Sequence, residues 1–140
     1  MTTARLDEII TAHSIREAPL MPILNEVQAE FGCIDEEAKR QIAKALNLTR
    51  TEVHGIVSFY HDYRETNAEL PIIKLCRAEA CQSRGSEALA AKAETMANGR
   101  ASIEPVYCLG LCSVGPNAMI GESVHARLDE PGLEALIREL

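Results

Sequence analysis

The first half of the chain repeats apolar residues every three to four positions, which is the spacing of amphipathic helices. This pattern predicts four short helices within the segments RLDEIITAH, LMPILNEVQAEFG, DEEAKRQIAKAL and LTRTEVHGIVSFYHDY. Asp35 is the expected cap of the third helix, Thr49 with Glu52 forms a capping-box pattern at the fourth, and Gly32 is the expected stop of the second. The apolar face of the fourth helix is expected to comprise Val53, Ile56, Val57 and Tyr60. Because short helices cannot hide an apolar face alone, we expect all four to pack together as a bundle.

The second half of the chain alternates strand-like and helix-like segments. The polar stretch RETNAEL before Pro71 predicts a boundary, with an N-terminal helical unit at 1–65 and a second unit at 66–140. Beyond it we expect strands at 72–76, 101–108, 117–121 and 123–128, and helices at 86–97 and 132–140. A strand, a crossover helix and a second strand form a parallel unit, and the following hairpin adds antiparallel strands. The predicted fold class is α+β, a helical bundle followed by a thioredoxin-like α/β domain with a mixed four-stranded sheet.

Composition and charge exclude several classes of function. The 140 residues are 46% hydrophobic and carry a formal net charge of -7, without a basic run that would suit nucleic acid. No stretch has the apolar length of a membrane span, and the start MTTARLDEIITAHS does not resemble a secretion signal. We therefore expect a soluble cytoplasmic protein, in which clustered cysteines bind a metal or do redox chemistry more often than they form disulfides.

Four of the five cysteines form two pairs, each directly after an apolar segment. Cys76 and Cys81 lie in KLCRAEACQSRG, and Cys108 and Cys112 lie in VYCLGLC. If the two preceding strands are parallel neighbours, their C-terminal ends bring both pairs to one edge of the sheet. Pairs in structural zinc sites are usually separated by two residues, whereas these wider separations fit a [2Fe–2S] cluster with two thiolates on each iron. Zinc and a pair of disulfides remain as alternatives at this point.

Other residues refine this picture. Small residues near the pairs would let backbone N–H groups approach the sulfurs; these are Ala80, Gly110, Ser113 and Gly115. Cys33 is expected to be a small buried side chain, and no histidine adjoins a cysteine pair as a Rieske-type cluster would need. The bond between Gly115 and Pro116 is a candidate cis peptide.

Three segments resemble the thioredoxin-like [2Fe–2S] subunit family of NADH-linked oxidoreductases, which includes the 24 kDa subunit of respiratory NADH dehydrogenase. They are EVQAEFGCIDEEAKRQIAKALNLTRTEVHGIVSFYHDYR, KLCRAEACQSRG and VYCLGLCSVGPNAMI. The resemblance runs from the second expected helix to the last expected strand. It implies one [2Fe–2S] cluster with Cys76, Cys81, Cys108 and Cys112 as its ligands, and no substrate pocket on this chain.

Within the family, the sequence segments LCRAEACQ and SFYHDYR are most similar to the gamma subunit of soluble, molybdenum-containing, NAD-dependent formate dehydrogenases. That resemblance implies an electron relay beside a flavoprotein subunit that binds FMN and NADH and, through it, a molybdenum-containing catalytic subunit. The cluster would hold one of the flavin's two electrons briefly. The alternatives are the equivalent subunit of NADH:quinone oxidoreductase or of an NAD(P)-linked hydrogenase and, from another class, a structural zinc-binding interaction module.

Overall fold

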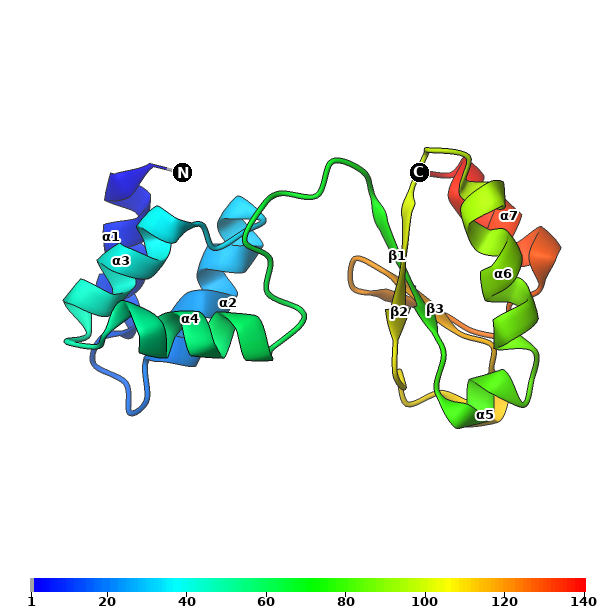
Figure 1. The fold of residues 1–140 in the computed structure, drawn as a ribbon, viewed down its shortest axis with the longest axis horizontal. Coiled ribbons are helices and arrows are strands. Elements are labelled where there is room, and N and C mark those ends of the chain that lie inside the picture. The colour runs from blue at the N-terminus through cyan, green and yellow to red at the C-terminus, as the bar shows by residue number, and fades with distance from the viewer. Residues whose placement is uncertain (1) are drawn as a thin grey trace. The chain divides into compact units, whose positions relative to one another are not determined.

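The computed structural model describes residues 2–140 and shows two compact units, which divide between Asn67 and Ala68. The first unit is helical and the second contains the only sheet found among the described residues (Figure 1).

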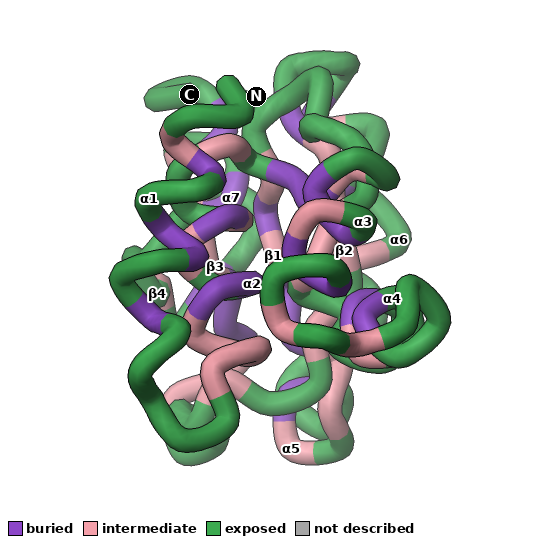
Figure 2. Tube along the Cα trace, turned by 90° about the vertical axis from the view of Figure 1, so that its left-hand side faces the viewer, coloured by how far each residue is buried: buried purple, intermediate pink, exposed green. Residues whose placement is uncertain are grey.

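The helical unit contains four short helices around one apolar core. They are α1 (Thr3–His13), α2 (Leu20–Phe31), α3 (Glu36–Ala45) and α4 (Arg50–Phe59). Buried and exposed residues alternate along α1, as expected for a helix with one inward face (Figure 2). The core comprises Leu6, Ile9, Ile10, Ile23, Leu24, Val27, Ile34, Ala38, Ile42, Ala43, Val53 and Val57. The predicted packing of four helices into a bundle is confirmed.

The predicted helix boundaries are set by side chains that bond to free backbone groups. The Asp35 carboxylate accepts a hydrogen bond from the N–H of Ala38 at 2.8 Å. At α4, Thr49 and Glu52 form the full capping box, because each side chain accepts from the backbone N–H of the other. The prediction that Tyr60 belongs to the apolar face of α4 was wrong. Tyr60 follows the last residue of α4 in an extended conformation, and it is 44% exposed.

A buried lysine ties the segment after α4 to this unit. Lys39 has no exposed surface, and its ammonium donates to the Glu65 carboxylate at 2.8 Å and pairs with Glu36. Burial works to lower the pKa of Lys39, but the two carboxylates outweigh it and raise the pKa above its ordinary value. The Gln28 side chain also bonds to this segment, accepting from the N–H of Arg64 at 3.0 Å. The residues that lead toward the second unit are therefore held against α2 and α3.

The second unit is a four-stranded mixed sheet with helices on one face. Its elements are β1 (Ile72–Cys76), α5 (Glu79–Gln82), α6 (Ser86–Ala97), β2 (Ser102–Val106), the 3-10 turn η1 (Cys112–Val114), β3 (Ala118–Ile120), β4 (Ser123–His125) and α7 (Glu130–Arg138). The strand order is β2-β1-β3-β4, with β1 and β2 parallel and both other pairings antiparallel. Helices α6 and α7 lie side by side against the sheet (Figure 1). Their core comprises Ile73, Leu75, Leu89, Ala93, Ala97, Ala101, Ala118, Leu128, Leu133 and Ile137.

The predicted fold class and the order β-α-β-β-α are confirmed, with differences at the element ends. Helix α5 was not expected, because four residues are too few to show helical periodicity. Helix α7 begins at Glu130 rather than 132, where Asp129 caps it by accepting from the N–H of Gly132. Among residues 2–140, no helix is long and apolar enough to span a membrane.

We expect Thr49→Ala to lower the free energy of unfolding by about 1 kcal/mol, because it removes one half of the capping box at the start of α4. Urea unfolding followed by far-UV circular dichroism measures the change. Thr51→Ala in the first turn of α4 is the matched control, since no cap bond involves Thr51. Equal stability of the Thr49 and Thr51 variants would contradict the assigned role of the cap.

Candidate functional site

The sheet brings both cysteine pairs to one edge. Cys76 is the last residue of β1 and is in register with Val106, the last residue of the parallel strand β2. The N–H of Arg77 donates to the carbonyl of Val106 at 2.8 Å, so the strands remain paired to their ends. The predicted strand 101–108 is too long: Cys108 lies two residues past β2, in a left-handed conformation with φ of 83° that a strand cannot continue.

The sulfurs of Cys108 and Cys112 are close enough to share one metal atom. The Sγ atoms of Cys108 and Cys112 are 3.6 Å apart. Two thiolates about 2.3 Å from one tetrahedral metal would be ~3.8 Å apart, so this separation fits shared coordination. The Cys76 and Cys81 thiols each contribute to the shift in the other's pKa, so they also lie near each other. The structure therefore provides two thiol pairs, one from each loop.

The loop from Cys108 to Cys112 is folded by backbone conformations that few residues adopt. Cys108 and Gly110 both have positive φ, 83° and 81°. For a non-glycine residue such a conformation carries a cost of about 1 kcal/mol or more. It turns the chain so that the N–H of Gly110 donates to the Cys108 sulfur at 3.4 Å, and Cys112 then begins the turn η1.

The one-turn helix α5 places Cys81 beside Gly115, in the segment that follows Cys112. The N–H of Cys81 donates to the carbonyl of Ala78 at 2.8 Å, which closes the first turn of α5. Gly115 lies so close that a Cβ atom built on it would be 2.9 Å from the Cys81 sulfur. Only glycine allows this approach, as expected for a glycine beside the sulfurs. The bond from Gly115 to Pro116, the candidate named from the sequence, is cis.

The thiols differ in how readily they carry a negative charge. Burial alone would raise the pKa of Cys76, but the N–H groups of Ala78, Cys108 and Leu109, together with the Cys81 thiol, outweigh it and lower that pKa. Burial, and then the neighbouring Cys76, raises the pKa of Cys81. Contact with Cys108 raises the pKa of Cys112. Ionisation of the Cys76 thiol is thus favoured, whereas that of Cys81 and Cys112 is opposed, and a bound cation would offset this opposition.

One side chain contacts both loops and was missed from the sequence. Asn117 is buried, and its Nδ2 atom donates to the Leu111 carbonyl at 2.8 Å and to the Cys81 sulfur at 3.6 Å. A single asparagine before a short strand has no distinctive spacing. Its one sequence cue is that it is polar directly before an apolar strand.

The two pairs differ in access to solvent. Cys76 and Cys81, the inner pair, are each 1% exposed. Cys108 and Cys112, the outer pair, are exposed. Tyr107, directly before the outer pair, is 71% exposed. Cys108 and Cys112 are therefore the cysteines of this site that a partner molecule can reach from solvent.

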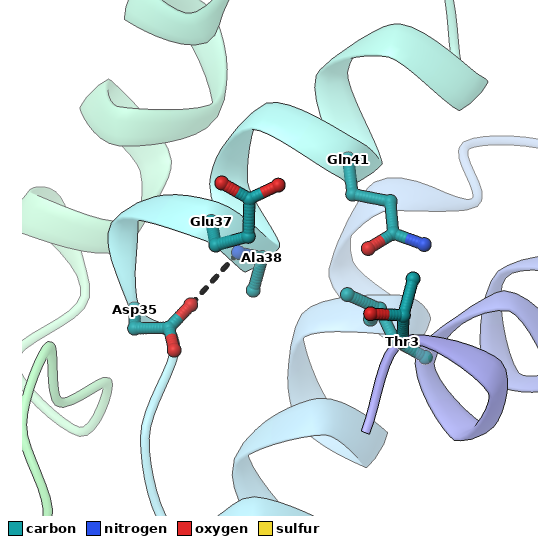
Figure 3. Close-up of a pocket in the computed structure, with 6 residues that line it drawn as sticks. Thr3, Asp35, Glu37, Ala38 and Gln41 are labelled. Carbon is teal, nitrogen blue, oxygen red and sulfur yellow. Dashed lines mark hydrogen bonds between the residues drawn. The ribbon is translucent and has the colours of Figure 1, made fainter. Parts of the chain in front are cut away.

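The remaining candidates do not form a second site. Cys33 is buried in the helical unit, as expected for a packing residue. A hollow of about 90 Å³ beside α1 and α3 is lined by Thr3, Leu6, Asp35, Glu37, Ala38 and Gln41 (Figure 3). Its Asp35 carboxylate already accepts a hydrogen bond from the N–H of Ala38 (Figure 3).

A second candidate is a group of three exposed side chains, Glu36, His54 and Glu65, whose ligand atoms are close enough together to hold a cation. The Lys39 ammonium contacts all three, so a positive charge already occupies this position.

Comparison with known proteins identifies the class. The family model described as thioredoxin-like [2Fe-2S] ferredoxin matches residues 6–140. NADH-quinone oxidoreductase subunit 2 of Thermus thermophilus is 31% identical over 88% of this chain and 69% of its own length. Another NADH-quinone oxidoreductase subunit, from Rhizobium meliloti, is 29% identical over 87% and 78%. The NADP-reducing hydrogenase subunit HndA of Solidesulfovibrio fructosivorans is 24% identical over 89% and 78%.

Solved structures agree on the fold. Crystal structures of an NAD+-reducing [NiFe]-hydrogenase, H2-reduced and air-oxidized, match with TM-scores of 0.69 and 0.71 at 23% identity. The matches cover 83% and 86% of this chain but only 21% and 22% of the hydrogenase chain. The chain thus has the fold of one part of a much larger protein.

Fold and site together define an iron–sulfur electron carrier with a thioredoxin-like sheet. The chain belongs to the thioredoxin-like [2Fe-2S] ferredoxin family, and its cofactor is a [2Fe–2S] cluster. The alternatives of zinc and of two disulfides are therefore set aside, and all five cysteines are free thiols in the structure.

The exposure of the thiols predicts their reactivity in the protein without its cluster. We expect Cys108 and Cys112 to react with iodoacetamide several times faster than the three buried cysteines, because the reagent reaches only the outer pair without local unfolding. Peptide mass spectrometry at successive times measures the five rates. Labelling in urea is the control, and there the difference should disappear. Labelling of Cys76 or Cys81 at the rate of Cys108 would contradict the described burial.

Proposed function

We propose that Cys76, Cys81, Cys108 and Cys112 are the four ligands of the cluster. The proposal is supported by the two close sulfur pairs at one sheet edge and by the backbone N–H groups aimed at them. Bound there, a [2Fe–2S] cluster accepts and returns one electron. The chain's own residues fix the four sulfurs, shield the inner pair from water and leave the outer pair accessible.

Replacing each cysteine by serine tests the ligand set. We expect Cys76→Ser, Cys81→Ser, Cys108→Ser and Cys112→Ser to lose most of the iron, the inorganic sulfide and the visible absorption, because a hydroxyl replaces a thiolate ligand. Cys33→Ser is the matched control and should keep full iron content, since Cys33 lies in the helical unit. A wild-type cluster in one of the first four variants would remove that cysteine from the set.

We infer further that the chain is the electron-transfer subunit of a cytoplasmic NAD-dependent formate dehydrogenase. In such a complex it would lie next to the flavoprotein subunit that binds FMN and NADH. A separate molybdenum-containing subunit would oxidise formate to CO2 while NAD+ is reduced to NADH. The assignment to a formate dehydrogenase is supported by two sequence segments, LCRAEACQ around the inner pair and SFYHDYR at the end of α4. The support for a complex that uses a nicotinamide cofactor is broader, since two relatives named above are NADH-quinone oxidoreductase subunits and a third belongs to an NADP-reducing hydrogenase.

The relatives also favour a second candidate of the same class. Subunits of NADH-quinone oxidoreductase and of an NADP-reducing hydrogenase are among them. In either of those complexes the chain would keep the same cluster and the same flavoprotein neighbour. The electron donor or acceptor of the other subunits would be a quinone or hydrogen instead of formate.

Purification of the intact complex through a tag on this chain separates the candidates. We expect co-purification of a flavoprotein and a molybdenum protein, and NAD+ reduction that depends on formate. After rapid mixing with NADH, we expect the electron paramagnetic resonance signal of a reduced [2Fe–2S] cluster. A complex without molybdenum that reduces quinones, or one that reduces NAD+ with hydrogen, would contradict the formate assignment and leave the ligand set unaffected.

A further inference from the structure

Asn117 connects three parts of the cysteine site. Its backbone carbonyl accepts from the N–H of Cys76 at 2.8 Å, at the end of β1. Its side-chain amide donates to the Cys81 sulfur at 3.6 Å and to the Leu111 carbonyl at 2.8 Å. The residue therefore contacts the inner cysteine pair and the loop that carries the outer pair.

The orientation of this amide follows from its neighbours. The carbonyl of Leu111 can only accept a hydrogen bond, so the nitrogen of the Asn117 amide must face it. The second hydrogen on the same nitrogen is then available to the Cys81 sulfur. The amide oxygen, Oδ1, is left buried without a hydrogen-bond partner.

That unpaired oxygen indicates that stability alone does not explain the asparagine. A buried acceptor without a partner is destabilising, because the hydrogen bond it made with water is lost and not replaced. An apolar side chain of similar branching would remove this unpaired oxygen, but it would also take the donor away from the Leu111 carbonyl and the Cys81 sulfur. The asparagine instead places its donor, rather than its acceptor, against a sulfur.

We propose that Asn117 is a positioning residue that fixes the Cys81 sulfur relative to the loop 108–112 and raises the reduction potential of the cluster. This inference rests on the proposed ligand set, because Cys81 must be a ligand for the contact to reach the cluster. The reduced cluster carries one more negative charge than the oxidised one. A hydrogen bond to a ligand sulfur stabilises the more negative state, so its removal disfavours reduction.

Redox titration of Asn117→Leu, followed by electron paramagnetic resonance, tests the proposal. We expect the equilibrium constant for reduction to fall about tenfold, which is ~59 mV for a one-electron couple. Asn117→Ala is the second variant, because it removes the same donor without adding volume. Ser86→Ala is the matched control, since Ser86 is also buried without a hydrogen-bond partner and lies in the same unit. It should keep the wild-type potential.

Each outcome decides the question. A lower potential in the Asn117 variants, or loss of iron from both while their circular dichroism stays that of the wild type, supports the proposal. Full iron content with an unchanged potential overturns it, and so does loss of folded structure in both variants, which would make Asn117 a residue of the fold alone. Failure of the ligand set is distinguishable, because Cys81→Ser would then keep its cluster.

Discussion

The structure of the second unit depends on keeping four thiols together at one edge of a sheet. Burial together with the neighbouring Cys76 raises the pKa of Cys81, and contact with Cys108 raises that of Cys112, so ionisation of these two thiols is opposed. In the proposed site, a cationic iron centre would offset this opposition by binding the thiolates.

The sheet supplies the rigid part of this arrangement. Parallel pairing of β1 with β2 places Cys76 beside the end of β2, and the loop beyond Val106 begins at the same edge. The crossover helix α6 covers Ile73 and Leu75 from one face, which fixes the strand from which Cys76 projects. Two backbone features position the remaining sulfurs. Cys108 adopts a left-handed backbone conformation that turns its loop, and the backbone at Gly115 lies close to the Cys81 sulfur.

The helical unit contributes no sulfur ligand to the proposed site, yet it is tightly built. Its four helices share one apolar core, a left-handed Gly32 ends α2, side-chain caps start α3 and α4, and Lys39 anchors the segment that follows α4. A lysine without exposed surface is stable there because two carboxylates compensate for its desolvation. The family match includes this unit, since the family model begins at residue 6. We infer that the unit is an integral part of this ferredoxin type.

The sequence by itself determined the elements and the candidate ligands, because helical periodicity, capping residues and paired cysteines are local patterns. The helices from Thr3 to Phe59, the strand at 72–76 and the helix at 86–97 could all be predicted in this way. Only the tertiary structure decided which pair is buried, where β2 ends and which side chain bridges the loops. Asn117 contacts Cys81 across 36 residues of chain, and the φ of Cys108 follows from the closure of its loop. Such features arise from packing between distant segments, so no local pattern of residues encodes them.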